Sequence, residues 1–202
     1  MRFKLHMIFL TLFFLLTIVP LWAQEGSECN RTAVSATTPE LRHFDWLVKL
    51  VTTPGTLYMV FDPGAAQARR SGLIEDVERT AIPEDRPKVR KFLNQTELHH
   101  GYKSLAHISY YMCKRPPCPP IKPEDYDVII RLFRDQKFRD EFFKSGQTGL
   151  QIGPLLNKEF PGKYTKSEIS CWEAFARYSA NAQLFADVAT VLCDPNVWGP
   201  CP

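Results

Sequence analysis

Six cysteines are the residues of this chain with the clearest chemistry, because their number is even and their spacing is irregular. Cysteines pair as disulfides in an oxidising compartment or bind a metal ion as thiolates. No paired C-x-x-C signature of a zinc site is present, so the pattern favours disulfides and predicts no metal centre. The six are Cys29, Cys113, Cys118, Cys171, Cys193 and Cys201.

Helix geometry narrows the pairings, which the sequence alone leaves open. If Cys171 and Cys193 lie on one continuous helix, the helical rise places them roughly 33 Å apart. A disulfide requires Cα atoms within about 7 Å, so these two are not expected to pair. The expected pairs are Cys193–Cys201, Cys113–Cys118 and Cys29–Cys171.

Other side chains that could catalyse a reaction lack a specific motif. His100 and His107 are seven positions apart, whereas helical zinc pairs such as H-E-x-x-H are closer and carry a glutamate, so we expect these and His99 to be ordinary histidines. The acids Glu124, Asp125 and Asp127 lie near an expected helix start, where capping and the helix dipole explain them. The sequence therefore predicts no catalytic residue and no cofactor, and it favours a protein that is not an enzyme.

The amino terminus has the layout of a secretory signal peptide. Arg2 and Lys4 precede an uncharged apolar run over 7–19, and Ala23 is a small residue at a suitable cleavage position. We expect residues 1–23 to be removed. The alternative is an uncleaved signal anchor, since the uncharged stretch is near the minimum length of a membrane span.

The remaining residues 24–202 have the length of one domain with a core of its own. Aromatic residues make up 12% of the chain, which argues against disorder. The formal net charge of +3 falls by two when Arg2 and Lys4 are removed. Neither nucleic acid nor an anionic membrane is therefore an expected partner, and no membrane span is expected after cleavage.

Two N-x-[ST] sequons are present, at Asn30 and Asn94. In a secreted chain both are candidate glycosylation sites if they are exposed.

The first half of the chain predicts two main helices. Thr38, Pro39 and Glu40 form a helix start, and apolar residues at helical spacing continue it to Val51. A second helix is expected from Asp85 to Met112. Between them, the segment 56–61 (TLYMVF) reads as a strand or a buried connector. The prolines within 114–123 end the second helix and predict a Pro-rich linker.

The second half predicts two further helices. One begins at Pro123 and ends near Gly146. The other begins with a capping box at Thr165–Glu168. Its apolar positions alternate by four and three residues up to Leu192, which is typical of a seam against a partner helix.

Together these elements predict a mainly α, disulfide-tied helical bundle of about four main helices. The alternative is an α+β fold with one small sheet that contains 56–61.

Two functional classes remain. The first is a secreted, extracellular binding or signalling protein that contacts another protein or a receptor. The second is a carrier of a lipid or other apolar small molecule held among the phenylalanines, although apolar helix faces usually fill a core. Trp198, between Cys193 and Cys201, is expected to be exposed and is the candidate partner contact. Alternatively, it only covers the end of the last helix.

Overall fold

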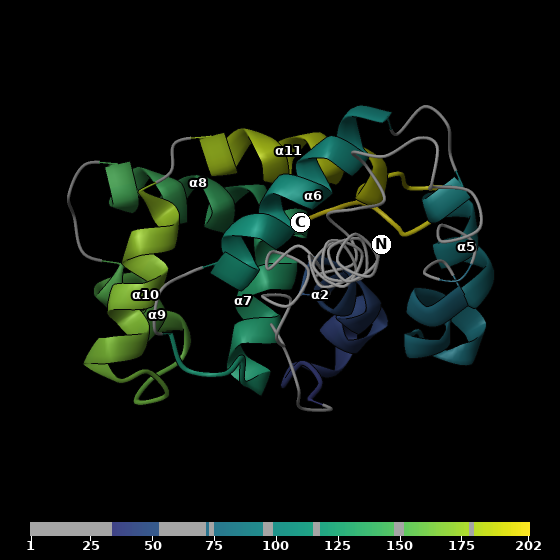
Figure 1. Ribbon diagram of the computed structural model, residues 1–202. Helices are drawn as coiled ribbons and strands as arrows, with labels where there is room; N and C mark the ends of the chain where they lie inside the picture. Colours follow the sequence, from purple (N-terminus) through teal and green to yellow (C-terminus); the bar gives the residue numbers. More distant parts are fainter. Residues whose placement is uncertain are drawn as a thin grey trace, which may run out of the picture.

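A computed structural model describes residues 34–52, 72, 75–94, 99–114, 118–147, 152–177 and 180–202. All regular structure within these ranges is helical, so the mainly α fold class is confirmed (Figure 1). The segment 56–61 of the small-sheet alternative lies outside the described residues. No helix in the described part of the chain is long and apolar enough to cross a bilayer.

The helices are shorter and more numerous than the sequence predicts. In chain order they are the 3-10 helix η2 (Pro39–Phe44), α2 (Asp45–Val51), the 3-10 helix η3 (Pro83–Asp85), α5 (Arg86–Asn94), α6 (His99–Lys114), α7 (Pro123–Arg134), α8 (Gln136–Gln147), α9 (Gly153–Glu159), α10 (Lys166–Ala176) and α11 (Ala180–Leu192). Residues 75–80 are helical as well.

The first predicted helix begins where expected, but Thr38 does not cap it with its side chain. The Thr38 hydroxyl instead donates to Asp127 of α7 at 2.9 Å, and the Thr37 backbone N–H donates to the same carboxylate at 2.8 Å. Asp127 is 1% exposed. It therefore fastens the start of η2 to α7, a tertiary role that its position near a helix start does not predict.

Two of the predicted long helices are each divided. The expected helix from Asp85 to Met112 is α5 followed by α6, with residues 95–98 outside the described ranges. The expected helix after Pro123 ends at Arg134, because Asp135 has extended backbone angles (φ −104°, ψ 100°). The Asp135 carboxylate then accepts the Phe138 backbone N–H at 2.8 Å, as an N-cap residue does.

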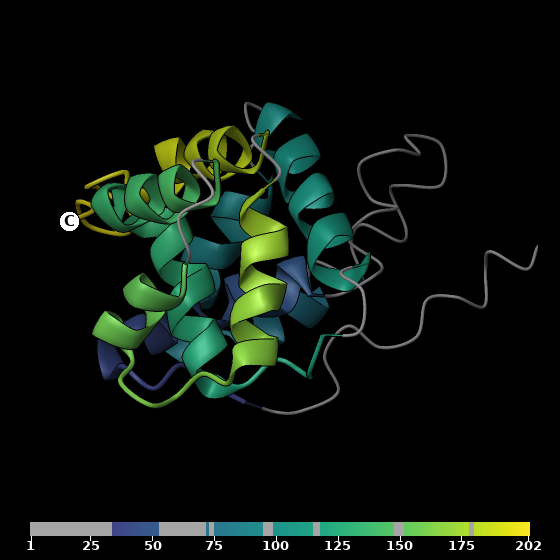
Figure 2. The same cartoon turned by 90° about the vertical axis from the view of Figure 1, so that its left-hand side faces the viewer.

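The last predicted helix is also wrong as a single element. Its capping box at Thr165 and Glu168 is confirmed, but α10 ends at Ala176 and α11 begins at Ala180. The two helices run in different directions (Figure 2). The seam is divided because its halves have different neighbours: α10 packs on α8 and α9, whereas α11 packs on α6, α7 and α8.

Aromatic side chains fill the core between these helices. The Phe133 and Phe185 ring centroids are 4.4 Å apart, and Phe143 lies 5.9 Å from Phe185. Every phenylalanine that the carrier hypothesis invokes is at most 2% exposed: Phe133, Phe138, Phe142, Phe143, Phe175 and Phe185. In the described core these rings therefore pack against one another.

A buried carboxylate joins α7 to α10 (the Asp125 cluster: Lys122, Asp125, Tyr164, Glu168 and Trp172). Asp125 accepts the Lys122 backbone N–H at 3.1 Å, the Tyr164 hydroxyl at 3.1 Å and the Trp172 indole N–H at 3.0 Å. The Lys122 ammonium pairs with Glu168 at 2.8 Å. Burial, with Asp125 beside it, raises the pKa of the Tyr164 hydroxyl. Each buried polar group named here has a partner.

Two disulfides are described, and one of them matches the sequence. The Cys193–Cys201 pair is confirmed, with Cα atoms 5.0 Å apart. The predicted Cys113–Cys118 and Cys29–Cys171 pairs are wrong, because Cys118 pairs with Cys171. The Asp125 contacts place the start of α7 against α10, which carries Cys171. Nearness along the chain is therefore a poor guide to this pairing.

The predicted linker between α6 and α7 is fixed at its second half. Cys118 forms the disulfide to α10, and Ile121 is 3% exposed. Residues 115–117 lie outside the described ranges.

Candidate functional site

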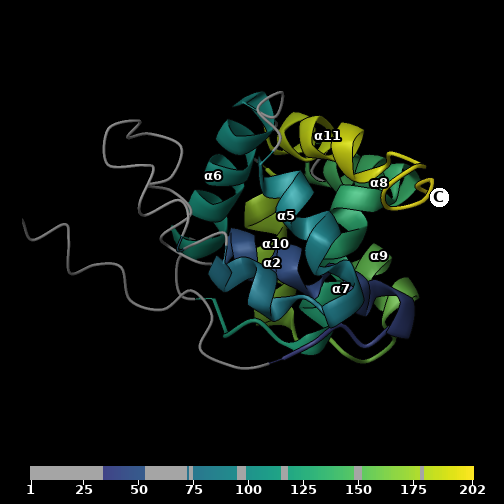
Figure 3. The ribbon, with the colours of Figure 1, turned by 90° about the vertical axis from the view of Figure 1, so that its right-hand side faces the viewer.

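The solvent side of α5 is basic because its apolar residues all face inward. Val89, Phe92 and Leu93 are at most 2% exposed and recur at helical spacing. The opposite side carries four cations and α5 contains no acidic residue. They are Arg86, Lys88, Arg90 and Lys91. In Figure 3 this helix lies on the side that faces the viewer.

An open depression of about 440 Å³ lies beside this helix. Its lining residues define the α5 groove: Glu78, Pro83, Arg86, Pro87, Arg90 and Lys91. The Arg90 guanidinium bonds the Glu78 carboxylate at 2.8 Å and so joins the helical residues 75–80 to α5.

A buried carboxylate lies at the start of α5 between two cation-forming side chains. Asp85 Oδ2 is 2.6 Å from His43 Nδ1, and Asp85 Oδ1 is 3.1 Å from Lys88 Nζ. The Asp85 side chain is 2% exposed, whereas the other two side chains are 46% exposed. Asp85 thus holds one edge of the imidazole and leaves His43 accessible to solvent.

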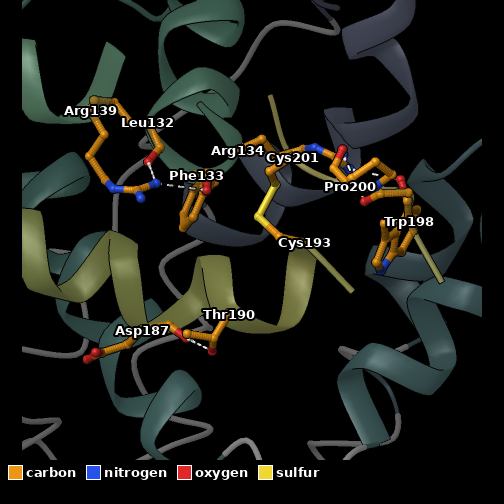
Figure 4. Close-up of a disulfide and its surroundings, with 11 residues drawn as sticks. Leu132, Phe133, Arg134, Arg139, Asp187, Thr190, Cys193, Trp198, Pro200 and Cys201 are labelled. Carbon is orange, nitrogen blue, oxygen red and sulfur yellow. Dashed lines mark hydrogen bonds between the residues drawn. A yellow bond between two sulfur atoms is a disulfide. The ribbon is translucent and has the colours of Figure 1, made fainter. Parts of the chain in front are cut away.

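The C-terminal loop (Asp194–Pro200) is closed by the Cys193–Cys201 disulfide (Figure 4). The Asp194 carbonyl accepts the backbone N–H groups of Val197 at 3.1 Å and Trp198 at 3.0 Å, and Gly199 has a positive φ of 77°. The Arg134 guanidinium donates to the carbonyls of Trp198, Gly199 and Pro200 at 3.2–3.4 Å. Burial lowers the pKa of Arg134. The loop is consequently held at both ends and along its backbone.

Trp198 is half-buried, so the expectation of an exposed aromatic is wrong. Its ring stacks on Trp46 with centroids 5.5 Å apart and lies 5.4 Å from the Phe44 ring. The Lys88 ammonium lies 5.4 Å from the Trp198 centroid, a cation–π distance. The loop therefore packs on aromatic residues of η2 and α2, and not on the end of α11 alone.

The indole N–H groups of Trp46 and Trp198 are both buried, and neither has a hydrogen-bond partner within the described ranges. Among the side chains that the structure describes, these are the two buried polar atoms left without a partner. Native proteins satisfy nearly all such groups, and each exception needs an explanation.

Comparison with protein-family models, with curated proteins and with solved structures finds no significant match. The function must therefore be argued from the site itself.

Most of the other sequence-predicted residues, or their side chains, lie outside the described part of the chain. Asn30 lies outside the described residues, as does Cys29. Asn94 is the last residue of α5, and its side chain is not among those described. His107 is exposed on α6, and the side chains of His99 and His100 are not described.

The chemistry available on this surface is ionic and hydrogen-bonding. Within the described ranges no three His, Cys, Asp or Glu side chains come together as a metal-ligand set. His43 and Asp85 have the relative geometry of a base and its orienting carboxylate. Charge pairing with an anionic group is the interaction that the four α5 cations offer most directly.

Sequence reasoning missed His43, Asp85 as its partner, and Arg134. His43 and Asp85 are 42 positions apart, and Arg134 reaches a loop that is more than 60 positions away. No local pattern reports contacts of that separation. The absence of acids in α5 was the one available signal for a basic face.

Proposed function

We propose that the protein is a secreted, disulfide-bonded extracellular protein that binds or signals through protein–protein contacts. In this proposal residues 1–23 are the signal peptide, residues 24–202 form one domain, and Asn30 and Asn94 carry glycans. The proposed core is a four-helix bundle of α6, α7, α8 and α11. It is supported by the packing of α11 on the other three helices and of α7 on α8.

The proposed contact surface is the solvent side of α5 together with the C-terminal loop. One observation carries it: the half-buried Trp198 ring lies 5.4 Å from the Lys88 ammonium of α5, and its indole N–H, like that of Trp46, has no hydrogen-bond partner among the described residues. An unsatisfied buried donor costs about 1–3 kcal/mol. Departures from complete hydrogen bonding are expected at sites kept for function rather than for stability.

The rigidity of the loop also supports binding. A disulfide, three hydrogen bonds from Arg134 and the stack on Trp46 fix the position of Trp198 before any partner arrives. A preformed surface loses less conformational entropy when it binds. Tryptophan and arginine are also the residue types that contribute most at protein interfaces.

The alternative function, a carrier of a lipid or other apolar molecule, requires space between the helices. The Phe133–Phe185 and Phe143–Phe175 contacts occupy the described core instead. No described feature favours the carrier over the binding protein. The carrier function is therefore treated as one possible result of the experiment below.

The test uses the full chain secreted from eukaryotic cells. Its binding to a panel of purified receptor ectodomains is compared with that of Trp198→Ala and Lys88→Gln, and Lys137→Gln on the exposed part of α8 serves as the control. We expect saturable binding to an ectodomain that the first two substitutions weaken and the control leaves unchanged. Native mass spectrometry of the same material tests the carrier function. Bound lipid, together with no binding to any ectodomain, would contradict the proposal and favour a carrier.

A further inference from the structure

Two cations of the α5 groove form no ion pair with any other described residue. Arg90 is paired with Glu78, but within the described residues neither Arg86 nor Lys91 forms an ion pair. The Arg86 Nε–H donates to the Ala81 carbonyl at 3.4 Å. A depression of about 440 Å³ with unmatched positive charge has the size and sign of a site for a carboxylate-bearing ligand.

The other lining residues decide between classes of anion. The groove offers few uncompensated charges to a densely charged polymer such as a sulfated polysaccharide, because Arg90 is already paired with Glu78. The Glu78 carboxylate can also accept a backbone N–H, and Pro83 and Pro87 offer apolar edges to aliphatic side chains. Cations, one acceptor and apolar edges together match a peptide better than a uniform polyanion.

The groove adjoins the C-terminal loop at Lys91. Lys91 lines the groove and, with Phe92 and Trp198, a cavity of about 10 Å³ under the C-terminal loop. A segment that lies along α5 therefore reaches from the unmatched cations to the loop.

We infer that the occupant of the α5 groove is an acidic segment of an extracellular protein, whose carboxylates pair with Arg86 and Lys91. The inference rests on the proposed function and names the chemistry of its partner. Recognition of acidic motifs by arginine and lysine clusters is a recurring mode of peptide binding. The affinity of the acidic segment for the α5 groove should fall as the salt concentration rises, because the interacting charges are exposed to solvent.

The test is an NMR titration of the full secreted chain at low ionic strength. The probes are a short capped peptide in which glutamate alternates with alanine, the same peptide with glutamine, and a heparin oligosaccharide. The variants are Arg86→Gln and Lys91→Glu, and Lys137→Glu on α8 is the matched charge-reversal control. Neither of the two tested side chains carries a described ion pair, so these variants are expected to fold.

We expect the glutamate peptide to shift the backbone amide signals of residues 84–86 and 88–91, since Pro83 and Pro87 have no N–H. Lys91→Glu should weaken this binding roughly tenfold, Arg86→Gln severalfold, and Lys137→Glu not at all. Equal binding of the glutamine peptide, or shifts elsewhere on the protein, would overturn the inference. Heparin binding at residues 83–91 without binding of the glutamate peptide would overturn it in favour of a polysaccharide.

Failure of this inference and failure of the proposed function give different results. If the partner is not acidic, ectodomain binding stays sensitive to Trp198→Ala but insensitive to Lys91→Glu. If the protein acts through no protein contact, the panel of ectodomains gives no saturable binding at all.

Discussion

The Asp125 cluster and the Trp46–Trp198 stack contain similar residues in opposite states. Trp172 is 1% exposed and its indole N–H donates to Asp125, whereas Trp46 is 0% exposed and its indole N–H has no partner. Polar groups in the first region are satisfied, and those in the second are not. We therefore expect the first region to contribute more hydrogen-bond stability to the fold than the second, which is part of the proposed contact surface.

The cation at the Trp198 ring, Lys88, is paired with Asp85, but the neighbouring Lys91 of the α5 groove differs from the cation of the Asp125 cluster. Lys122 pairs with Glu168 and lies 4.2 Å from the Tyr164 ring centroid. On α5, by contrast, Lys91 is exposed without an ion pair among the described residues. A cation that forms an ion pair within the protein contributes to the fold, whereas a cation without such a pair is available to a partner.

The largest expected difference concerns the disulfide of each region. Cys118–Cys171 closes 53 positions and Cys193–Cys201 closes eight. Because a longer loop loses more entropy when it is cross-linked, removal of the first pair should cost about 4 kcal/mol and removal of the second about 2.5 kcal/mol. Urea unfolding of Cys118→Ser/Cys171→Ser and Cys193→Ser/Cys201→Ser measures both. The reverse order would show that the C-terminal loop, not the Asp125 region, holds the fold together.

The natural chain, which is the reference for this unfolding, also tests the connectivity. A peptide map of the oxidised protein should show Cys118 joined to Cys171 and Cys193 joined to Cys201. Cys118 recovered with Cys113 would contradict the placement of α7 against α10.

Asp125→Ala should lower the free energy of unfolding by about 3 kcal/mol, because it leaves the Tyr164 and Trp172 donors buried without this acceptor. Asp125→Asn keeps one acceptor oxygen and should cost less. Glu141→Ala, at an exposed position of α8, is the control and should change stability little. Chemical denaturation followed by circular dichroism measures all three. If the Asp125→Ala protein were as stable as the control, the Asp125 cluster would not contribute to the stability of the fold.

Tyr164 predicts how stability depends on alkaline pH. Burial and Asp125 raise its pKa in the folded state. Its contribution is therefore complete below the unfolded value of about 10 and is lost as pH rises above it, at about 1.4 kcal/mol per pH unit. Stability measured from about pH 9 to pH 11 should fall more steeply for the natural chain than for Tyr164→Phe. Equal slopes would contradict the raised pKa.

The sequence predicts those helix ends that carry a local signal. Thr165 with Glu168, and Pro123 at the start of α7, both stand where the pattern places them. The division at Asp135 had a signal too, since aspartate is a favoured N-cap residue, but the apolar pattern on both sides hid it.

The candidate site was less predictable because it depends on distant parts of the chain. The pairing of Cys118 with Cys171 follows from tertiary packing around Asp125, and the contact of His43 with Asp85 joins η2 to η3. Trp198 was identified from its place between two cysteines. Its half-burial depends on Phe44 and Trp46, more than 150 positions earlier in the sequence.

The most direct test of the contrast between the two regions is a matched pair of substitutions, Trp172→Phe and Trp46→Phe. Both remove the same atoms from side chains that are at most 1% exposed, but only the first removes a hydrogen bond, the one to Asp125. The free energy of unfolding should therefore fall by about 1 kcal/mol more for Trp172→Phe than for Trp46→Phe. An equal loss, or a larger loss for Trp46→Phe, would show that the Trp46 indole N–H is satisfied and would contradict the account.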